Sequence, residues 1–328
     1  MTAIEISSFG EPEVLKPVER AKPFAKNDEV VIRVEAAGVA RADTLQRQGK
    51  YPPPPGASDI PGLDIAGVID SVGSTVKEFK PGDPVCAILA GGGYAEFCAV
   101  PAIQVLPIPE NWTAVEAVTL PENMLTVYDN LVTRAGLKSG DVVLIHGGTS
   151  GIGSTAIMLA RALDATPITT AGSTKKCDAA LTFGAAHAIN YKESDFVSET
   201  RKVTSGRGVD VVLDMVGGAY LEKNLDCLAM EGRLAILATQ GGRVAPLDIG
   251  KLMLKRSRVM GSTMRARSPE QKGEVARRVF QDVWPLLPSK DVIRPIIDST
   301  FPLTNAPLAH RRMEEGEHIG KIVLVPQK

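Results

Sequence analysis

A glycine-rich turn near the middle of the chain has the residue types and the spacing needed to hold a phosphate. The apolar run 142–145 predicts a buried strand before the turn, and the apolar spacing of 152–163 predicts a helix after it. Partnerless backbone N–H groups and the positive end of the helix dipole converge at such a turn, so a diphosphate can bind there. A serine replaces the middle glycine of G-x-G-x-x-G, and the predicted phosphate-binding residues are Gly148, Ser150, Gly151, Ile152 and Gly153.

The end of the next predicted strand indicates which dinucleotide fits. Proteins that bind NAD place a carboxylate about 20 residues after the glycines, where it accepts a hydrogen bond from the ribose 2′-hydroxyl. Here the segment after Thr170 carries Ser173, Lys175 and Lys176 and no carboxylate. A hydroxyl and an ammonium bind a 2′-phosphate, which a carboxylate would repel. We therefore predict NADPH in preference to NADH; the alternative is that the two lysines only begin a solvated helix.

The elements that must position these residues change type along the chain. Up to residue 113, short β-branched runs alternate with Gly and Pro turns, which predicts a mainly β structure. The spacing of 116–133 predicts a helix, and from 142 to 262 strands and helices alternate, which is typical of a doubly wound parallel sheet. The end of the chain returns to mixed strands. We expect an α/β protein with two domains, residues 1–122 with 268–328, and residues 123–267.

Composition limits the class of protein. A chain of 328 residues, 44% of them hydrophobic, can bury the cores of two domains. Its net charge of −1 gives no indication of a nucleic-acid or membrane-surface partner. The four cysteines form no C-x-x-C pair, so they are predicted to be reduced thiols of a cytoplasmic protein. Neither a signal peptide nor an apolar run of about 20 residues is evident.

Three segments resemble the medium-chain dehydrogenase/reductase superfamily: 141–153, the run R-A-D-T-L-Q-R-Q-G-K-Y-P-P-P-P-G at 41–56, and H-I-G-K-I-V-L at 318–324. Within that superfamily the chain is similar to the zinc-independent quinone oxidoreductases related to zeta-crystallin, and most of all to their tumour-suppressor-inducible branch. The resemblance extends along the whole chain. It implies a GroES-like β-rich domain and a Rossmann domain, with the active site in the cleft between them, and a homodimer.

The resemblance also implies roles for single residues. Ser173, Lys176 and Tyr191 match positions that hold the 2′-phosphate of NADPH, and Gly151 with Ile152 match the diphosphate turn. Further positions match residues near the nicotinamide end or elsewhere along the cofactor: Thr126, Asp214, Leu237, Thr239 and Lys321. One position departs from the family, because Ala40 stands where many members have an asparagine that meets the nicotinamide amide.

No metal is expected. Zinc members carry a cysteine near position 40, a Gly-His-Glu segment and a cluster of four cysteines, whereas this chain has Ala40, Gly62-Leu-Asp64 and scattered cysteines. A zinc site needs three or four converging N, S or O side chains. His146, which begins the glycine turn, is expected to support that turn.

Hydride transfer without a metal suits acceptors that are already electron-poor, namely quinones and α,β-unsaturated carbonyls. The protein then has to hold the acceptor close and stabilise the charge that develops on its oxygen. Tyr51, at the start of the proline-rich segment 51–56, is the predicted hydrogen-bond donor, and Asp43 is a candidate acid relay. The alternatives are a packing role for Tyr51 and a turn or ion-pair role for Asp43.

The sequence therefore favours an NADPH-dependent quinone reductase. Two other functions stay open: an NADPH-dependent enone or alkenal double-bond reductase, and a non-catalytic NADPH-binding redox sensor, for which Ala40 is a slight indication.

Overall fold

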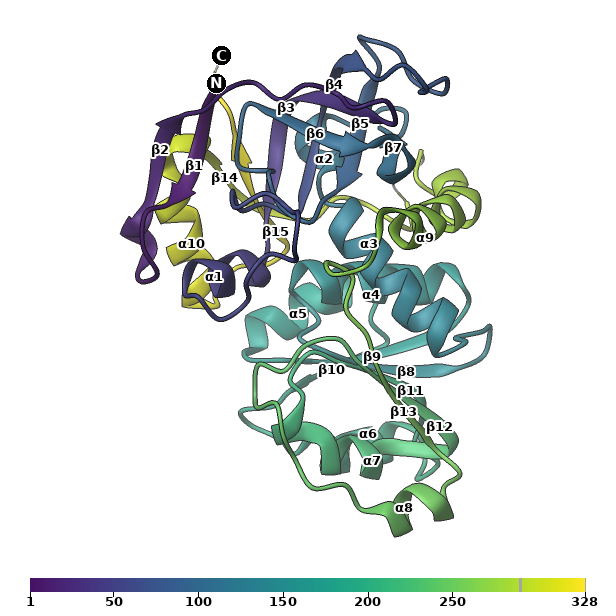
Figure 1. Ribbon diagram of the computed structural model, residues 1–328. Coiled ribbons are helices and arrows are strands. Elements are labelled where there is room, and N and C mark those ends of the chain that lie inside the picture. Colours follow the sequence, from purple (N-terminus) through teal and green to yellow (C-terminus); the bar gives the residue numbers. More distant parts are fainter. Residues whose placement is uncertain (289–290, 328) are drawn as a thin grey trace. The chain divides into compact units, whose positions relative to one another are not determined.

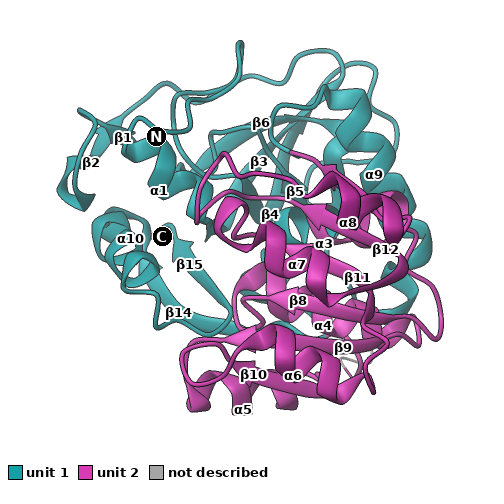
Figure 2. Cartoon of the chain, turned by 90° about the horizontal axis from the view of Figure 1, so that it is seen from below, with its two compact units in different colours: residues 1–125, 264–290, 294–328 teal, residues 126–263, 291–293 magenta. Residues whose placement is uncertain are grey.

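The computed structural model describes residues 1–288 and 291–327, and the chain divides into two compact units. Unit 1 comprises 1–125, 264–290 and 294–328, and unit 2 comprises 126–263 with 291–293 (Figure 2). The C-terminal segment thus returns to the unit formed by the N-terminal part. The units change at positions slightly different from the predicted domain limits, 122/123 and 267/268, which remain a prediction.

Unit 2 is built on one parallel sheet. Its strands are β8 (Val142–His146), β9 (Thr166–Ala171), β10 (His187–Asn190), β11 (Val209–Asp214), β12 (Leu228–Ile236) and β13 (Arg258–Gly261). Their order is β10-β9-β8-β11-β12-β13, and every neighbouring pair is parallel. The order reverses between β8 and β11, which makes the carboxyl end of β8 the switch point where ligands of such sheets bind. The predicted doubly wound sheet is confirmed.

Helices cover both faces of this sheet. Figure 1 shows α4 (Gly151–Ala162) and α5 (Thr174–Thr182) on one face, and α6 (Phe196–Val203) and α7 (Leu221–Cys227) on the other. The short α8 (Ile249–Leu254) precedes β13. Strand residues such as Leu144, Ile168 and Val212 are fully or almost fully buried, as both faces of a covered sheet require.

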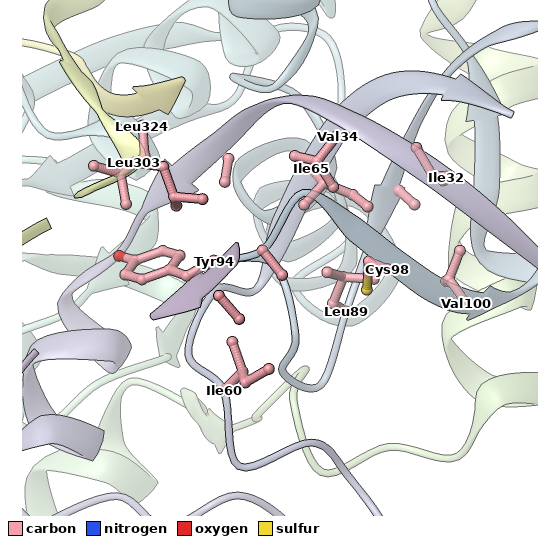
Figure 3. Close-up of a cluster of buried hydrophobic side chains, with 14 of the residues drawn as sticks. Ile32, Val34, Ile60, Ile65, Leu89, Tyr94, Cys98, Val100, Leu303 and Leu324 are labelled. Carbon is pink, nitrogen blue, oxygen red and sulfur yellow. The ribbon is translucent and has the colours of Figure 1, made fainter. Parts of the chain in front are cut away.

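Unit 1 holds a mainly antiparallel sheet. Its order is β14-β15-β3-β4-β5-β7, with β6 also pairing with β3. The strands are β3 (Glu29–Val39), β4 (Asp64–Val72), β5 (Pro84–Ile88), β6 (Phe97–Pro101), β7 (Val105–Pro107), β14 (Ile297–Pro302) and β15 (Lys321–Val325), and a hairpin of β1 (Thr2–Ile6) and β2 (Leu15–Glu19) stands beside it. Because β15 pairs with β3, the chain's last strand completes the core that Ile32, Val34, Tyr94 and Leu324 share (Figure 3).

The helices in the first 134 residues differ from the prediction in two places. The helix expected over 116–133 is interrupted: α2 (Ala114–Ala117) ends before α3 (Pro121–Tyr128), and a wider π-helical turn, Asp129–Arg134, follows. Pro121 explains the break, because proline lacks the N–H that a continuous helix needs and is favoured at a helix start. The second difference is α1 (Arg41–Arg47), a helix within the family-like run that was not predicted.

Two elements close unit 1. Helix α9 spans Pro269–Asp282, and α10 spans Ala306–Glu315. Gly316 ends α10 in the left-handed conformation, a common helix stop. The segment of four prolines after Tyr51 is irregular, because proline lacks a backbone N–H and has a fixed φ. Across the described residues, no helix has the length and apolar character needed to cross a membrane.

Candidate functional site

The turn between β8 and α4 presents the first turn of a helix with Ser150 as its cap. The Ser150 hydroxyl accepts a hydrogen bond from the Gly153 N–H at 3.0 Å and donates one to the Gly147 carbonyl at 2.9 Å. The N–H groups of Gly151 and Ile152, the first residues of α4, have no partner inside the helix. The serine at the middle position of the motif therefore keeps the turn closed and leaves helix N–H groups for an anion.

The glycines of this turn are required by its shape. Gly147 has a φ of +67°, which L side chains rarely adopt. A Cβ on Gly148 would overlap the Thr169 side chain of β9, and a Cβ on Gly153 would overlap the backbone at Gly147. Close packing of strand, turn and helix thus accounts for both of the motif glycines.

A series of buried hydrogen bonds between side chains connects the ends of these strands. Thr170 donates to His146 Nδ1 (3.0 Å), His146 Nε2 donates to Asn224 Oδ1 (2.8 Å), and Asn224 Nδ2 donates to Asp214 Oδ2 (3.0 Å). Burial lowers the pKa of His146 to about 4, so this histidine is neutral at pH 7. It supports the turn, as the sequence suggested.

Asp214 belongs to this series of hydrogen bonds. Its carboxylate accepts hydrogen bonds from the backbone N–H of Val216 (2.6 Å) and of Gly217 (3.1 Å) in the turn that follows β11. Burial raises its pKa to about 6. The structure places Asp214 at the predicted strand end, where it holds the turn in shape.

The turns after β11 and β12 lie against each other. The Leu237 N–H donates to the Asp214 carbonyl at 2.9 Å, and a Cβ on Gly217 would stand 2.9 Å from the Thr239 Cα. Met215 reaches the turn of β8, with its sulfur 3.8 Å from the Ser150 hydroxyl. The predicted residues 148–153, 214, 237 and 239 are therefore brought to the same edge of the sheet.

Ser173 and Tyr191 meet at the end of β9. Ser173 caps α5, and its hydroxyl accepts from the Lys176 N–H at 3.3 Å. A Cβ on Gly172 would lie 2.8 Å from the Tyr191 hydroxyl, so Tyr191 stands over the residue before Ser173. We call Ser173, Lys176 and Tyr191 the β9 corner. An open cavity of about 280 Å³ adjoins it, lined by Tyr191, Lys192, Tyr220 and Lys223 together with Glu193 and Asp195.

Thr126 carries a buried hydroxyl that finds no hydrogen-bond partner among the residues the structure describes. Its backbone carbonyl accepts from Asn130 Nδ2 at 2.9 Å. Buried polar atoms in native proteins are nearly always paired, so a partnerless hydroxyl fits a residue whose partner is a ligand.

In unit 1, Tyr51 is half-buried at the start of the proline-rich segment. The Arg265 guanidinium lies 5.2 Å from the centre of its ring and donates to its backbone carbonyl at 3.2 Å. Burial raises the pKa of the Tyr51 hydroxyl, the Arg265 charge lowers it, and the Glu122 carboxylate raises it. The phenol therefore carries its proton at neutral pH and can donate it.

Asp43 lies at the start of α1 and is fully buried. Its carboxylate accepts from the N–H of Ala40 at 2.8 Å, from the N–H of Gly62 at 2.9 Å and from the Tyr94 hydroxyl at 3.4 Å. Burial raises its pKa to about 6. These contacts correspond to the turn role weighed as its alternative, and the acid-relay role stays a prediction.

Lys321 is buried in unit 1 between two carboxylates. Its ammonium lies 2.7 Å from Asp64 Oδ2 and 3.8 Å from Glu122 Oε2. Gly38 makes room for this pair, since a Cβ there would overlap both side chains. Burial, with smaller contributions from Asp64 and Asp43, raises the pKa of Glu122 to about 7, against the opposing effect of Lys321. The predicted contact of Lys321 with the cofactor stays a prediction.

Sequence reasoning missed Arg265, Asp64 and Glu122 as functional candidates. Arg265 follows Tyr51 by 214 residues, so no local pattern connects them. Glu122 is the second residue of a helix that begins with proline. An acidic residue there is typical of an ordinary helix start, so it gave no indication of function. Within the described part of the chain, no three His, Cys, Asp or Glu side chains gather as a metal site would require.

Comparisons with known proteins match both units. Residues 26–110 match the model of the alcohol dehydrogenase GroES-like domain, and residues 151–281 match that of the zinc-binding dehydrogenases. Human quinone oxidoreductase is 30% identical over 99% of this chain and 98% of its own length. The chain belongs to the quinone oxidoreductase family. The resemblance to that group of the medium-chain dehydrogenases/reductases, a superfamily of oxidoreductases, is thereby confirmed.

Solved structures of related proteins span several activities. Escherichia coli quinone oxidoreductase complexed with NADPH has a TM-score of 0.87 and 31% identity, covering 99% of this chain and all of that one. An NAD-dependent alcohol dehydrogenase has a TM-score of 0.88 and 30% identity, with both chains fully covered. The enoyl reductase JamJ has a TM-score of 0.88 and 26% identity over 99% of both chains. The quinone oxidoreductase fold is thus confirmed, and its cofactor and acceptor have to be argued from the residues of this chain.

Proposed function

We propose that the protein is an NADPH-dependent quinone reductase that works without zinc. The observation that carries this proposal is the β9 corner: a hydroxyl at a helix cap, a lysine one turn later and a tyrosine, in a position where NAD-binding proteins place a carboxylate. A 2′-phosphate gains charge-assisted hydrogen bonds there and meets the positive end of α5.

The rest of the dinucleotide would follow the strand ends of unit 2. We propose that the turn at Gly148, Ser150, Gly151, Ile152 and Gly153 holds the diphosphate through the N–H groups of α4. The partnerless Thr126 hydroxyl and the turns at Asp214, Leu237 and Thr239 are then available to the nicotinamide half. When bound, NADPH supplies a hydride.

Tyr51 is the proposed proton donor to the acceptor. Reduction of a quinone to a hydroquinone consumes one hydride and one proton, and the quinone oxygen gains negative charge as the hydride arrives. The Tyr51 hydroxyl gives its proton to that oxygen, and solvent restores the proton to the phenolate. The Arg265 charge beside the ring favours this transfer, because it stabilises the phenolate.

An enone or alkenal reductase is the second candidate, and the structural similarity to an enoyl reductase favours it. The same cofactor site and the same tyrosine would serve it, because the enolate oxygen of an enone takes the place of the quinone oxygen. A non-catalytic redox sensor is the third, since Ala40 offers no amide to a nicotinamide.

A screen of NADPH oxidation separates these functions. Purified protein is assayed with ortho- and para-quinones, alkenals, enones and primary alcohols, with NADH in parallel and zinc measured by elemental analysis. We expect turnover of quinones with NADPH at a kcat/KM at least tenfold above that with NADH, without stoichiometric zinc. Faster turnover of alkenals assigns the second function, and binding of NADPH without oxidation of any acceptor assigns the third.

We further propose that the protein is a homodimer that pairs through β13. This strand ends the sheet of unit 2, and the neighbouring α8 exposes apolar side chains that monomers seldom leave in water: Ile249, Met253 and Leu254 are 63%, 70% and 79% exposed. Light scattering is expected to give the mass of a dimer for the wild type and of a monomer for Met253→Glu with Leu254→Glu. Phe280→Glu, at an exposed position on α9, serves as the control.

A further inference from the structure

Arg265 is a buried cation whose partners in the described structure are all neutral. Its side chain is only 5% exposed, and it forms no ion pair with any described carboxylate. Instead it donates to three neutral acceptors: the Ala90 carbonyl at 2.8 Å, the Tyr51 carbonyl at 3.2 Å and Gln46 Oε1 at 2.5 Å. Burying a guanidinium without a counter-charge is costly, so these contacts require an explanation beyond packing.

The contacts of Arg265 hold both ends of the loop 51–59, which contains the four prolines. Arg265 binds the loop directly at Tyr51, and its partner Gln46 donates through Nε2 to the Asp59 carbonyl at 2.9 Å, at the far end of the same loop. Gln46 lies on α1, whose position is set by the buried Asp43 and Arg47. The bond to Ala90 adds the glycine-rich segment that follows β5, whose Gly92 N–H donates to the Ile60 carbonyl at 2.7 Å.

The same guanidinium lies beside the Tyr51 ring, 5.2 Å from its centre. The groups that act electrostatically on the Tyr51 hydroxyl are this cation and the Glu122 carboxylate on α3, which has the opposite effect. Asp43 acts on Arg265 from α1. Arg265 is therefore placed to do two things at once, to fix the backbone of Tyr51 and to stabilise the phenolate that proton donation leaves behind.

We propose that Arg265, together with Gln46, is the positioning residue of Tyr51 in the reduction of the acceptor. The planar fork of arginine fits this task, because its separate N–H groups bind three carbonyl oxygens while its face remains free for the ring. The proposal rests on the proposed function, in which Tyr51 donates the proton. It adds a residue that lies 214 positions from Tyr51 in the sequence.

A double-mutant cycle tests the coupling. Quinone turnover is measured for the wild type, Tyr51→Phe, Arg265→Met and the double variant, with NADPH binding followed by fluorescence. We expect Tyr51→Phe to lower kcat about 100-fold and Arg265→Met to lower it at least tenfold, with the KM for NADPH unchanged. In the Tyr51→Phe background, Arg265→Met is expected to change kcat less than twofold, because its effect passes through the missing hydroxyl.

Two conservative variants separate charge from geometry. Arg265→Lys keeps the charge and loses the fork, and Gln46→Leu releases the loop while leaving Arg265 in place. Both are expected to lower kcat at high substrate without moving the alkaline limb of the pH–rate profile. Arg265→Met is expected to move that limb to higher pH, because loss of the cation raises the pKa of Tyr51 and its acid form persists further into alkali.

The outcomes distinguish this inference from the proposed function. Equal losses from Arg265→Met in the wild type and in Tyr51→Phe would show that Arg265 acts independently, and would overturn the positioning role alone. Wild-type turnover by Tyr51→Phe would overturn both the proton-donor role and this inference. Thermal unfolding of each variant, with the exposed Arg277→Met on α9 as control, identifies losses caused by unfolding; if Arg265→Met unfolds, Gln46→Leu in both backgrounds decides the question.

Discussion

The charge at the end of β9 decides which ribose the proposed site accepts. Ser173 stands at the helix cap with its hydroxyl on the Lys176 N–H, and Tyr191 stands over the adjoining glycine. A single carboxylate at the cap would accept from a 2′-hydroxyl and repel a 2′-phosphate, so one residue is enough to change the preference. Such a replacement changes the affinity for the cofactor and leaves the stability of the helix unchanged, because both Ser and Asp can cap a helix.

The substitution Ser173→Asp is expected to remove the preference for NADPH. The new carboxylate repels the 2′-phosphate, so the ratio of kcat/KM for NADPH to that for NADH should fall at least tenfold, as loss of a charge-assisted hydrogen bond predicts. Initial rates with both cofactors check this. Ser205→Asp adds the same charge on an exposed loop of unit 2, and an equal change in that variant would contradict a local effect.

At the scale of elements, α1 shows how a short helix organises unit 1 through buried polar side chains. Arg47 pairs with Glu314 of α10 at 2.5 Å and donates to the Gly10 carbonyl at 2.9 Å. His310 of α10 accepts from Arg47 at 3.4 Å and bonds to the Tyr94 hydroxyl at 3.1 Å. Burial and the Arg47 charge lower the pKa of His310 to about 3, so it stays neutral in this network.

Replacing Arg47 with methionine is expected to destabilise the protein by about 3 kcal/mol, because Glu314 and His310 lose a buried partner. Arg41→Met, at an exposed position on the same helix, is expected to change the free energy of unfolding by less than about 0.5 kcal/mol. Denaturant titration measures both. Similar values for the two variants would show that the α1–α10 network adds no stability.

A second prediction concerns the stability of the turn from β8 to α4. In Gly148→Ala the new methyl group would overlap Thr169 of β9, so we expect a loss of about 2 kcal/mol and weaker NADPH binding. Gly250→Ala, inside α8, meets only the flexible end of Asp248 at 3.3 Å and is expected to be neutral or stabilising. Thermal unfolding of both variants checks this, and a neutral Gly148→Ala would mean that β9 can move away.

At the scale of the whole molecule, one buried cluster in unit 1 holds three carboxyl groups around one ammonium. Asp43, Asp64 and Glu122 surround the single ammonium of Lys321, and burial raises the pKa of all three carboxyls. One proton is therefore retained near neutral pH, and the side chain of Glu122, which is 20% exposed, is the member with access to solvent. The stability of the chain must then depend on pH.

The free energy of unfolding is expected to fall as pH rises from about 4.5 to 7, and Glu122→Gln should reduce that fall. Folded Glu122 keeps its proton up to a pKa of about 7, whereas the ordinary pKa of a glutamate is 4.5, so the unfolded state binds fewer protons in this window. The contribution of Glu122 to this fall in the free energy of unfolding is on the order of 2 kcal/mol. Denaturant titrations at pH 5 and pH 8 measure the difference, with the exposed Glu110→Gln as control; an unchanged slope in Glu122→Gln would contradict the assignment.

Periodicity and turn chemistry were sufficient to predict much of unit 2. The alternation of strands and helices and the glycine turn with a serine at its middle position depend on residues close together in the chain, so local sequence carries them. The same reasoning predicted one helix over 116–133 and did not predict α1, because Pro121 and the buried polar face of 41–47 act against the simple apolar pattern.

Tertiary structure decided what the polar residues of unit 1 do. By itself the sequence determined a dinucleotide turn, a cap without a carboxylate and a tyrosine before four prolines. Only the folded chain brought Arg265 to Tyr51, Lys321 to Asp64 and Glu314 to Arg47, across 214, 257 and 267 residues. Burial gives these pairs their effect, because charges removed from water interact strongly with whichever partner the fold supplies.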